Sequence, residues 1–489
     1  MAQYDLLIKG GRIVIPRHGE VMSDIGIKDG RFTSLAEDID PSQASKMIDA
    51  EGMLVFPGAI DGHYHFGIHL PLDEDVTSGS EAAVLNGVTT VISYFRTGHD
   101  YLDKTGPYRT IFPEVLKLSE NASFTDYCYH LGIITREQLD EIPMLVEEYG
   151  VSGFKYWMFY KIFDVRATGA IGREYLMSPE PCDLGHLYLI MRKVAEMNEK
   201  YKEHGTIRVS VHCEEPELIR IFLEEAKNSG MTGLRAFSHS RPGFCEKVAI
   251  LETATLANEV GCPLILLHLS SREAIEAVAS IAQLYPRLDV RTEVTPHHLG
   301  LTIDTVAAGV WGKINPPLRE SDDINALWEA IKSGSVDIIG SDYAAHLKEE
   351  QVTSTDSDVW SAPLGLGSSP FYPLLLTEGY LKRGVPLTRI AELAALNPAT
   401  CHSLYPKKGS ILIGADADLA IIDLDMEKTI SPEVLKGGSG FTVFAGMKLK
   451  GWPVYTIIRG KVVFRNGKTE GKPGYGQYVK RPVGLHYPC

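Results

Sequence analysis

The sequence predicts an α/β protein, a (β/α)8 TIM barrel with a small β-sandwich domain formed by the N- and C-terminal segments. Three observations support this fold class. Eight short apolar runs alternate with amphipathic stretches, chemically active residues stand at the ends of several runs, and turn-rich strand patterns flank the region on both sides. At 489 residues the chain has room for a barrel with insertions and a companion domain.

The elements can be justified in chain order. Residues 1–55 contain short strand patterns separated by Gly-Gly, Asp-Gly and Glu-Gly turn signals, which is typical of antiparallel strands. Residues 56–410 form the predicted barrel, with helices in amphipathic stretches such as PELIRIFLEEAKNSG and SREAIEAVASIAQLY. The eight predicted barrel strands lie in FPGAIDGHYHFG, GVTTVISY, DYCYHLGII, VSGFKYWMFY, RVSVHCE, PLILLHLS, DVRTEVTP and VDIIGSD.

The C-terminal part of the chain returns to strands. Residues 411–470 include the hairpin signal Asn466-Gly467, and we expect them to join residues 1–55 in the β-sandwich domain. Residues 471–489 form a C-terminal tail that is long enough to reach a neighbouring subunit.

Composition excludes several classes of protein. No apolar run approaches the roughly 20 residues of a membrane span, so we expect no membrane partner. The net charge of −15 argues against nucleic acid as a partner, because nucleic-acid-binding proteins are usually basic on at least one face. The N-terminus has no secretory h-region, and the seven scattered cysteines form no CxxC pair. These features predict a cytoplasmic location.

Six potential metal ligands occur in a fixed order, and five of them stand at the ends of apolar runs. A barrel gathers the C-terminal ends of its strands around one site, so residues far apart in sequence converge there. A His-x-His pair alone is weak evidence, but six such groups can hold two divalent metal ions. Zinc suits histidine and carboxylate ligands, while Mn, Co or Fe would also bind them. The six residues are His63, His65, Lys155, His212, His268 and Asp342.

Lys155 is the unusual member of this set. An ammonium has no lone pair, and burial beside two dications would disfavour it strongly. If its amine reacts with carbon dioxide, the resulting carbamate is an anionic ligand that can bridge two ions. The alternative is a lysine whose stem packs on Phe154 and Trp157 while its head reaches water. With the five other ligands present, we favour the carbamate.

The chain resembles the cyclic amidohydrolases, that is, the hydantoinases, dihydropyrimidinases, allantoinases and dihydroorotases. PGAIDGHYH resembles the family's first-strand signature, and GFKYWMFY is similar to the hydantoinase strand in which a tyrosine, here Tyr160, follows the carboxylated lysine by five residues. EVTPHHLGLT, KINPPLRE and SDYAAHLKEE are more similar to dihydroorotases and allantoinases. The resemblance also implies a homo-oligomer, either a tetramer or a dimer.

The ligand set predicts the chemistry. Two ions that share a carbamate and a hydroxide would lower the pKa of the bridging water to near 7, giving a nucleophile at neutral pH. Asp342 would bind metal, accept the proton and pass it to the leaving nitrogen. By itself, Asp342 would more readily be interpreted as a helix N-cap.

Three further residues are candidates for substrate contact. The resemblance implies that Tyr160 donates a hydrogen bond to the developing oxyanion, although an aromatic residue on this strand also suits core packing. Asn315 resembles a substrate-binding position, and its alternative role is a turn residue before Pro316. Thr295 is a weaker candidate for substrate binding.

Other polar residues have supporting roles in this interpretation. We expect Glu215 to orient His212, His346 to be a weak candidate for the site, and His297 and His298 to be structural or to support the ligands.

Two departures from the family pattern bear on the substrate. After His65 the chain reads Phe66-Gly67-Ile68-His69-Leu70, without the arginine that holds the substrate carboxylate in dihydroorotases. Dihydroorotate is therefore disfavoured, because a buried carboxylate without a partner costs several kcal/mol. In addition, Tyr343 stands where relatives commonly have a histidine after the metal-binding aspartate.

The sequence therefore predicts a binuclear metal-dependent hydrolase that opens the ring of a cyclic amide of the hydantoin or dihydropyrimidine type. The alternatives are an allantoinase-like ureide hydrolase and a catalytically silent, dihydropyrimidinase-related assembly protein. Intact ligands argue against the silent protein, and a mononuclear deaminase on the same barrel would have no use for Lys155. The substrate itself depends on loops such as residues 348–369.

Overall fold

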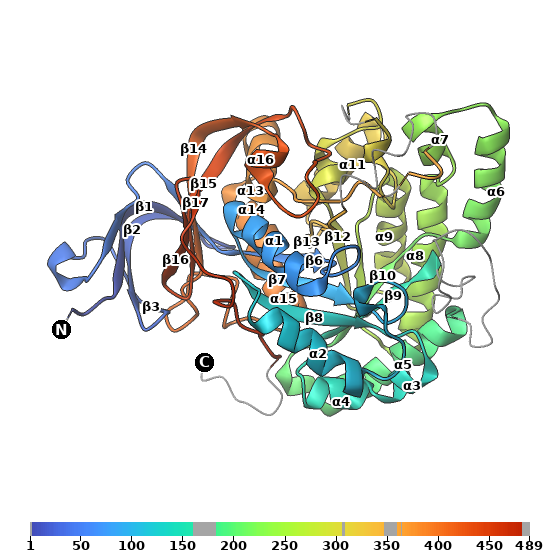
Figure 1. The fold of residues 1–489 in the computed structure, drawn as a ribbon, viewed down its shortest axis with the longest axis horizontal. Coiled ribbons are helices and arrows are strands. Elements are labelled where there is room, and N and C mark those ends of the chain that lie inside the picture. Colours follow the sequence, from blue (N-terminus) through green and yellow to red (C-terminus); the bar gives the residue numbers. More distant parts are fainter. Residues whose placement is uncertain (1, 160–181, 306–308, 347–358, 363, 482–489) are drawn as a thin grey trace.

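The computed structural model describes residues 2–159, 182–305, 309–346, 359–362 and 364–481. Tyr160 and most of residues 348–369 therefore lie outside the described residues. Figure 1 shows a barrel surrounded by helices, with a separate β-sheet along one flank.

Eight parallel strands form the barrel, and each pairs with the next strand along the chain. The main-chain N–H of Tyr343 donates to His63 O at 3.3 Å, and that of His65 donates to Tyr343 O at 2.7 Å, so the last segment closes against the first strand. The predicted barrel is confirmed, with one strand in each of the eight runs. The strands are β6 (Ala59–Tyr64), β7 (Val88–Phe95), β8 (Asp126–Gly132), β9 (Gly153–Trp157), β10 (Arg208–His212), β11 (Leu264–Leu266), β12 (Val290–Val294) and β13 (Ile338–Ile339).

Amphipathic helices cover the outside of the barrel. α9 illustrates why they form: Ser271 caps its first turn by accepting the Ala274 N–H at 3.2 Å, and Ala274, Ala277 and Ile281 are buried along one face. The principal helices are α1 (Leu72–Leu85), α2 (Tyr108–Glu120), α3 (Arg136–Asp140), α4 (Ile142–Glu147), α5 (Leu184–Lys200), α6 (Pro216–Asn228), α7 (Gly233–His239), α8 (Gly243–Val260), α9 (Arg272–Leu284), α10 (Pro296–Gly300), α11 (Ser321–Ser333), α13 (Phe371–Leu374), α14 (Leu387–Ala391), α15 (Asn397–Cys401) and α16 (Pro432–Leu435).

Strands from both ends of the chain form one mostly antiparallel, nine-stranded sheet, which is the second unit predicted from the sequence. β5 joins the two halves, because it pairs parallel with β1 and antiparallel with β14. Apolar residues of both halves share one core. The strands are β1 (Leu6–Ile15), β2 (Gly19–Lys28), β3 (Arg31–Ala36), β4 (Met47–Asp49), β5 (Leu54–Pro57), β14 (Leu419–Thr429), β15 (Lys448–Ile458), β16 (Lys461–Arg465) and β17 (Lys468–Thr469).

A buried ion-pair network attaches this sheet to the end of the barrel opposite the predicted ligands. The Lys408 ammonium lies 2.7 Å from carboxylate oxygens of both Asp126, the first residue of β8, and Asp418, which precedes β14. The C-terminal tail also lies against its own barrel over residues 471–481: Tyr127 in β8 accepts a main-chain hydrogen bond from Val479 at 2.8 Å. The described part of the tail is thus used within the subunit.

Candidate metal centre

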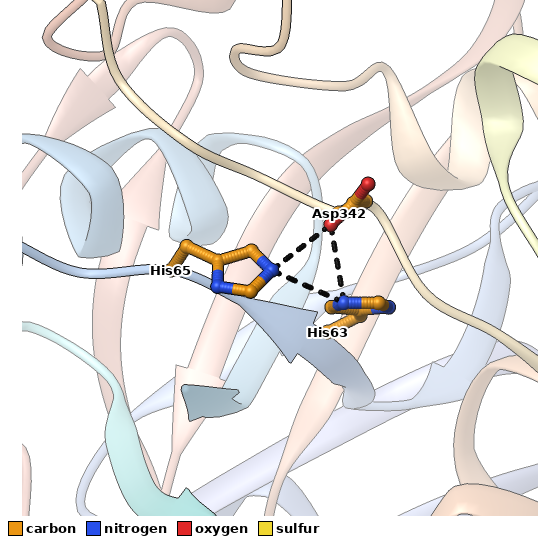
Figure 2. A group of neighbouring side chains, drawn as sticks. All are labelled: His63, His65 and Asp342. Carbon is orange, nitrogen blue, oxygen red and sulfur yellow. Dashed lines mark hydrogen bonds and ion pairs between the residues drawn. The ribbon is translucent and has the colours of Figure 1, made fainter. Parts of the chain in front are cut away.

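Three of the predicted ligands meet where the first and last barrel strands close. His63 is the last residue but one of β6, His65 directly follows that strand, and Asp342 lies just after β13. One carboxylate oxygen of Asp342 lies 3.1 Å from Nε2 of His63 and 3.1 Å from Nε2 of His65, and these two nitrogens are 3.2 Å apart. Figure 2 shows the three side chains pointing toward one another. All are buried and could hold one metal ion; we call them the first ligand group.

Backbone strain and electrostatics both distinguish Asp342. Its φ is +55°, a left-handed conformation that costs free energy for a residue with a side chain and is found at functional sites. Burial alone would raise the pKa of its carboxyl, but the neighbouring imidazoles of His63 and His65 hold that pKa at about 2. Asp342 is therefore an anion, the form in which a carboxyl group can bind a metal ion.

Lys155 lies inside the barrel in β9 and is 1% exposed, so its head does not reach water. Its Nζ is 3.4 Å from Nε2 of His63 and 4.5 Å from the centroid of the Tyr94 ring. Burial lowers the pKa of this amine to about 8, against the opposing charges of Asp342 and Glu293. A minor fraction of the amine is therefore uncharged near neutral pH, and the uncharged form is the one that reacts with carbon dioxide.

His212 and His268 lie beside this amine and form the second ligand group. Their ring centroids are 4.3 Å apart, and the ring of His268 is 5.4 Å from that of His63. Nδ1 of His268 is buried without a hydrogen-bond partner among the described residues. An unsatisfied buried nitrogen is costly unless another ligand meets it. The convergent imidazoles, the anionic carboxylate and this unpaired nitrogen all fit a divalent metal centre.

The structure reveals a supporting residue that the sequence interpretation missed. Glu293 in β12 is fully buried, and its Oε1 accepts hydrogen bonds from Nδ1 of His63 at 2.6 Å and from the main-chain N–H of His268 at 3.2 Å. It therefore touches both ligand groups. The available signal was the alternation in DVRTEVTP, which places Glu293 on the same strand face as Arg291.

Glu293→Gln should weaken metal binding by about 10-fold, because a neutral amide is a poorer hydrogen-bond acceptor for His63 and lowers its basicity as a ligand. Competition with a chelator of known affinity measures the change. Glu246→Gln is a matched control, since Glu246 is equally buried but pairs with Arg319. That control should lower stability and leave metal affinity unchanged. Equal metal affinity in Glu293→Gln and the wild type would contradict this role.

The predicted supporting and substrate-contact residues differ in their burial and in their hydrogen-bond partners. Glu214 contacts His212, with Oε2 2.7 Å from Nε2. Its neighbour Glu215, the residue predicted to orient His212, caps α6 by accepting the Glu217 N–H. Thr295 is fully buried, and its hydroxyl lies 2.8 Å from Nδ1 of His298. Asn315 is half-buried, and its Oδ1 has no partner among the described residues.

The other histidines do not join the two ligand groups directly. Nε2 of His298 lies 3.1 Å from the main-chain oxygen of Pro316, which gives this residue a structural contact. His346 stacks on His69 with ring centroids 3.7 Å apart. Tyr160, the predicted oxyanion donor, falls outside the described residues.

The fold and this candidate centre together are those of a barrel enzyme that carries possible metal ligands at its strand ends. The chain belongs to the Amidohydrolase family, whose model matches residues 54–463.

The comparisons also identify individual relatives. The chain is 33% identical to the D-hydantoinase of Geobacillus stearothermophilus, covering 97% of this chain and 96% of the relative. It is 30% identical to the allantoinase of Rubrobacter xylanophilus, covering 98% of both. The solved L-hydantoinase (dihydropyrimidinase) of Arthrobacter aurescens superposes with a TM-score of 0.84 at 29% identity, over 98% of this chain and all of that one. Among the described residues, no helix combines the length and apolarity needed to cross a membrane.

Proposed function

We propose that the protein is a binuclear metal-dependent hydrolase that opens the ring of a cyclic amide of the hydantoin or dihydropyrimidine type. The observation that carries the proposal is the burial of Lys155 against His63, with imidazoles of both ligand groups around it. A buried ammonium among metal ligands would repel the ions, whereas a carbamate would bind them. Relatives named hydantoinase, matched over nearly their whole length, support the substrate class.

The two ligand groups suggest how the ions are shared. His63, His65 and Asp342 would hold one ion, His212 and His268 the other, and the Lys155 carbamate would serve both. Zinc is the proposed metal, with Mn, Co or Fe as substitutes that the same donors accept. When bound, such ions provide a water of lowered pKa and polarise the carbonyl to be attacked.

The side chains of this protein supply the rest of the proposed mechanism. Asp342 receives the proton of the attacking water and returns it to the ring nitrogen, which leaves poorly unless it is protonated. Tyr160 donates a hydrogen bond to the oxyanion. Asn315 contacts the ring, a role supported by its buried Oδ1, which has no hydrogen-bond partner in the described part of the chain. Thr295 is proposed as a further substrate contact near α10.

An allantoinase-like ureide hydrolase is the second candidate, because relatives of 30% identity carry the name allantoinase over 98% of this chain. A catalytically silent assembly protein is disfavoured, since a protein without catalysis has no need to keep all six groups converging in a buried site. The proposal also includes a homo-oligomer, a tetramer or a dimer, which light scattering tests. It further includes a cytoplasmic location, for which the free thiols of the described cysteines give support.

Ring opening of hydantoin, dihydrouracil and allantoin by metal-loaded protein tests the proposed function, with chelator-treated protein as the control. Turnover of hydantoin or dihydrouracil that disappears with the chelator and returns with zinc is the expected result. Turnover of allantoin alone would favour the second candidate. Failure to open any ring, together with absence of bound metal, would favour the silent protein.

A further inference from the structure

We infer that Tyr101 is a positioning residue of the metal centre, which orients His65 through its hydroxyl and is itself held in place by a left-handed turn. The inference rests on the proposed metal centre and extends it to a residue outside the six ligands.

The contact with His65 uses the ring nitrogen that faces away from the first ligand group. The Tyr101 hydroxyl lies 2.8 Å from Nδ1 of His65, while Nε2 of the same ring lies 3.1 Å from the Asp342 carboxylate. A neutral imidazole carries its proton on one nitrogen only. If Nδ1 donates that proton to the Tyr101 oxygen, the lone pair of Nε2 points at the position of the metal ion.

The backbone around Tyr101 is strained. Four successive residues, none of them glycine, have positive φ: Asp100 at 66°, Tyr101 at 49°, Leu102 at 75° and Asp103 at 51°. Each left-handed residue with a Cβ costs free energy, and a run of four is very unusual. Such a segment keeps this conformation only where contacts with the surrounding structure hold it in place.

Several contacts hold the turn against the segment that carries His65. The Tyr101 N–H donates to Gly67 O at 3.0 Å, and the Gly98 N–H donates to Lys104 O at 2.7 Å and closes the loop. The Tyr101 ring is 2% exposed and packs with its centroid 5.4 Å from that of Phe95. Tyr101 therefore makes two contacts with this segment. Its hydroxyl contacts the His65 side chain, and its main-chain N–H contacts Gly67, two residues after His65.

The two histidines of the first ligand group have different partners. Nδ1 of His63 lies 2.6 Å from the carboxyl group of Glu293, whereas Nδ1 of His65 lies 2.8 Å from the Tyr101 hydroxyl. Tyr101 therefore fixes the direction of the His65 ring. The side-chain hydrogen bond of Tyr101 is made to His65, a member of the first ligand group. Loss of the Tyr101 hydroxyl should lower the affinity for the ion at the first ligand group and leave the affinity for the other ion unchanged.

Tyr101→Phe tests this inference, because it removes the hydroxyl and keeps the ring. Tyr129→Phe is the matched control: Tyr129 is also buried, but its hydroxyl lies 2.7 Å from Ser119. Metal retained per chain is measured against increasing chelator. We expect Tyr101→Phe to bind one of its two ions about 10- to 100-fold more weakly than the wild type, with the other ion and the circular dichroism spectrum unchanged. The control should match the wild type in both ions.

The outcomes separate this inference from the proposed function. Equal affinity of Tyr101→Phe and the wild type for both ions would overturn the inference and leave the metal centre standing. Equal weakening of both ions would also overturn it. A wild type that retains no metal would overturn the proposed function and the inference with it.

A second pair of variants tests the strained turn. Asp103 is exposed, so Asp103→Gly and Asp103→Ala lose the same side chain contacts, including the weak pairing with His99. Glycine adopts a positive φ without penalty, whereas alanine does not. The glycine variant should therefore unfold at a higher temperature than the alanine variant while keeping wild-type metal affinity. Equal unfolding temperatures would contradict the left-handed turn.

Discussion

Lys155→Ala is expected to lose at least one metal ion per chain and most of the activity. The reason is that the substitution removes the only proposed ligand that serves both ions. Metal analysis of the dialysed protein and a ring-opening assay measure the two effects. A mutant that keeps both ions and full activity would end the carbamate interpretation.

Chemical rescue sharpens this test. Lys155→Ala leaves a space in which a short carboxylic acid can place two oxygens, so acetate or propionate should restore part of the metal content and activity. Lys155→Arg is the matched control, since arginine fills the same space and forms no carbamate under these conditions. It should be inactive with and without the acid. Rescue of the arginine variant would show that the acid acts elsewhere.

Asp342→Asn should reduce kcat by about 10²- to 10⁴-fold, the usual contribution of a group that moves a proton in the transition state. The amide accepts no proton at neutral pH and is a poorer metal ligand than a carboxylate. The fold should survive, because asparagine tolerates the positive φ of +55° found at this position.

Asp337→Asn is the control for this variant. Asp337 precedes the same strand, β13, but at its opposite end, where its carboxylate pairs with Arg291 at 3.2 Å. The same chemical change there should alter stability and leave kcat close to the wild-type value. An Asp342→Asn protein with unchanged kcat would remove Asp342 from the proton path.

The barrel could be predicted because its signals are local and repeated. Each strand is a short apolar run, and the residue types that bind metals follow the runs where a parallel sheet presents its strand ends. The nine-stranded sheet was harder to predict from the sequence. Whether β5 joins β1 and β14 into one continuous sheet depends on long-range pairing, which turn signals and alternation do not specify.

The supporting residues of the centre were harder to predict for two different reasons. Glu293 left a weak signal, a charged residue on the inward face of a barrel strand, which is significant only once the ligands around it are known. Tyr101 left none. Its turn runs against the local preferences of four residues with side chains, so tertiary contacts override the sequence there. Glu214 and Glu215 are adjacent residues of the same type. Which of the two side chains faces His212 depends on the local backbone conformation, which a sequence pattern does not specify.

A crystal structure of the zinc-loaded protein, with anomalous diffraction recorded at the zinc edge, tests the central claim most directly. Two anomalous peaks are predicted in each chain, one beside His63, His65 and Asp342 and one beside His212 and His268. Electron density extending from Nζ of Lys155 toward both peaks is predicted as well. A single peak, or an unmodified Lys155 beside two peaks, would contradict the binuclear carbamate centre.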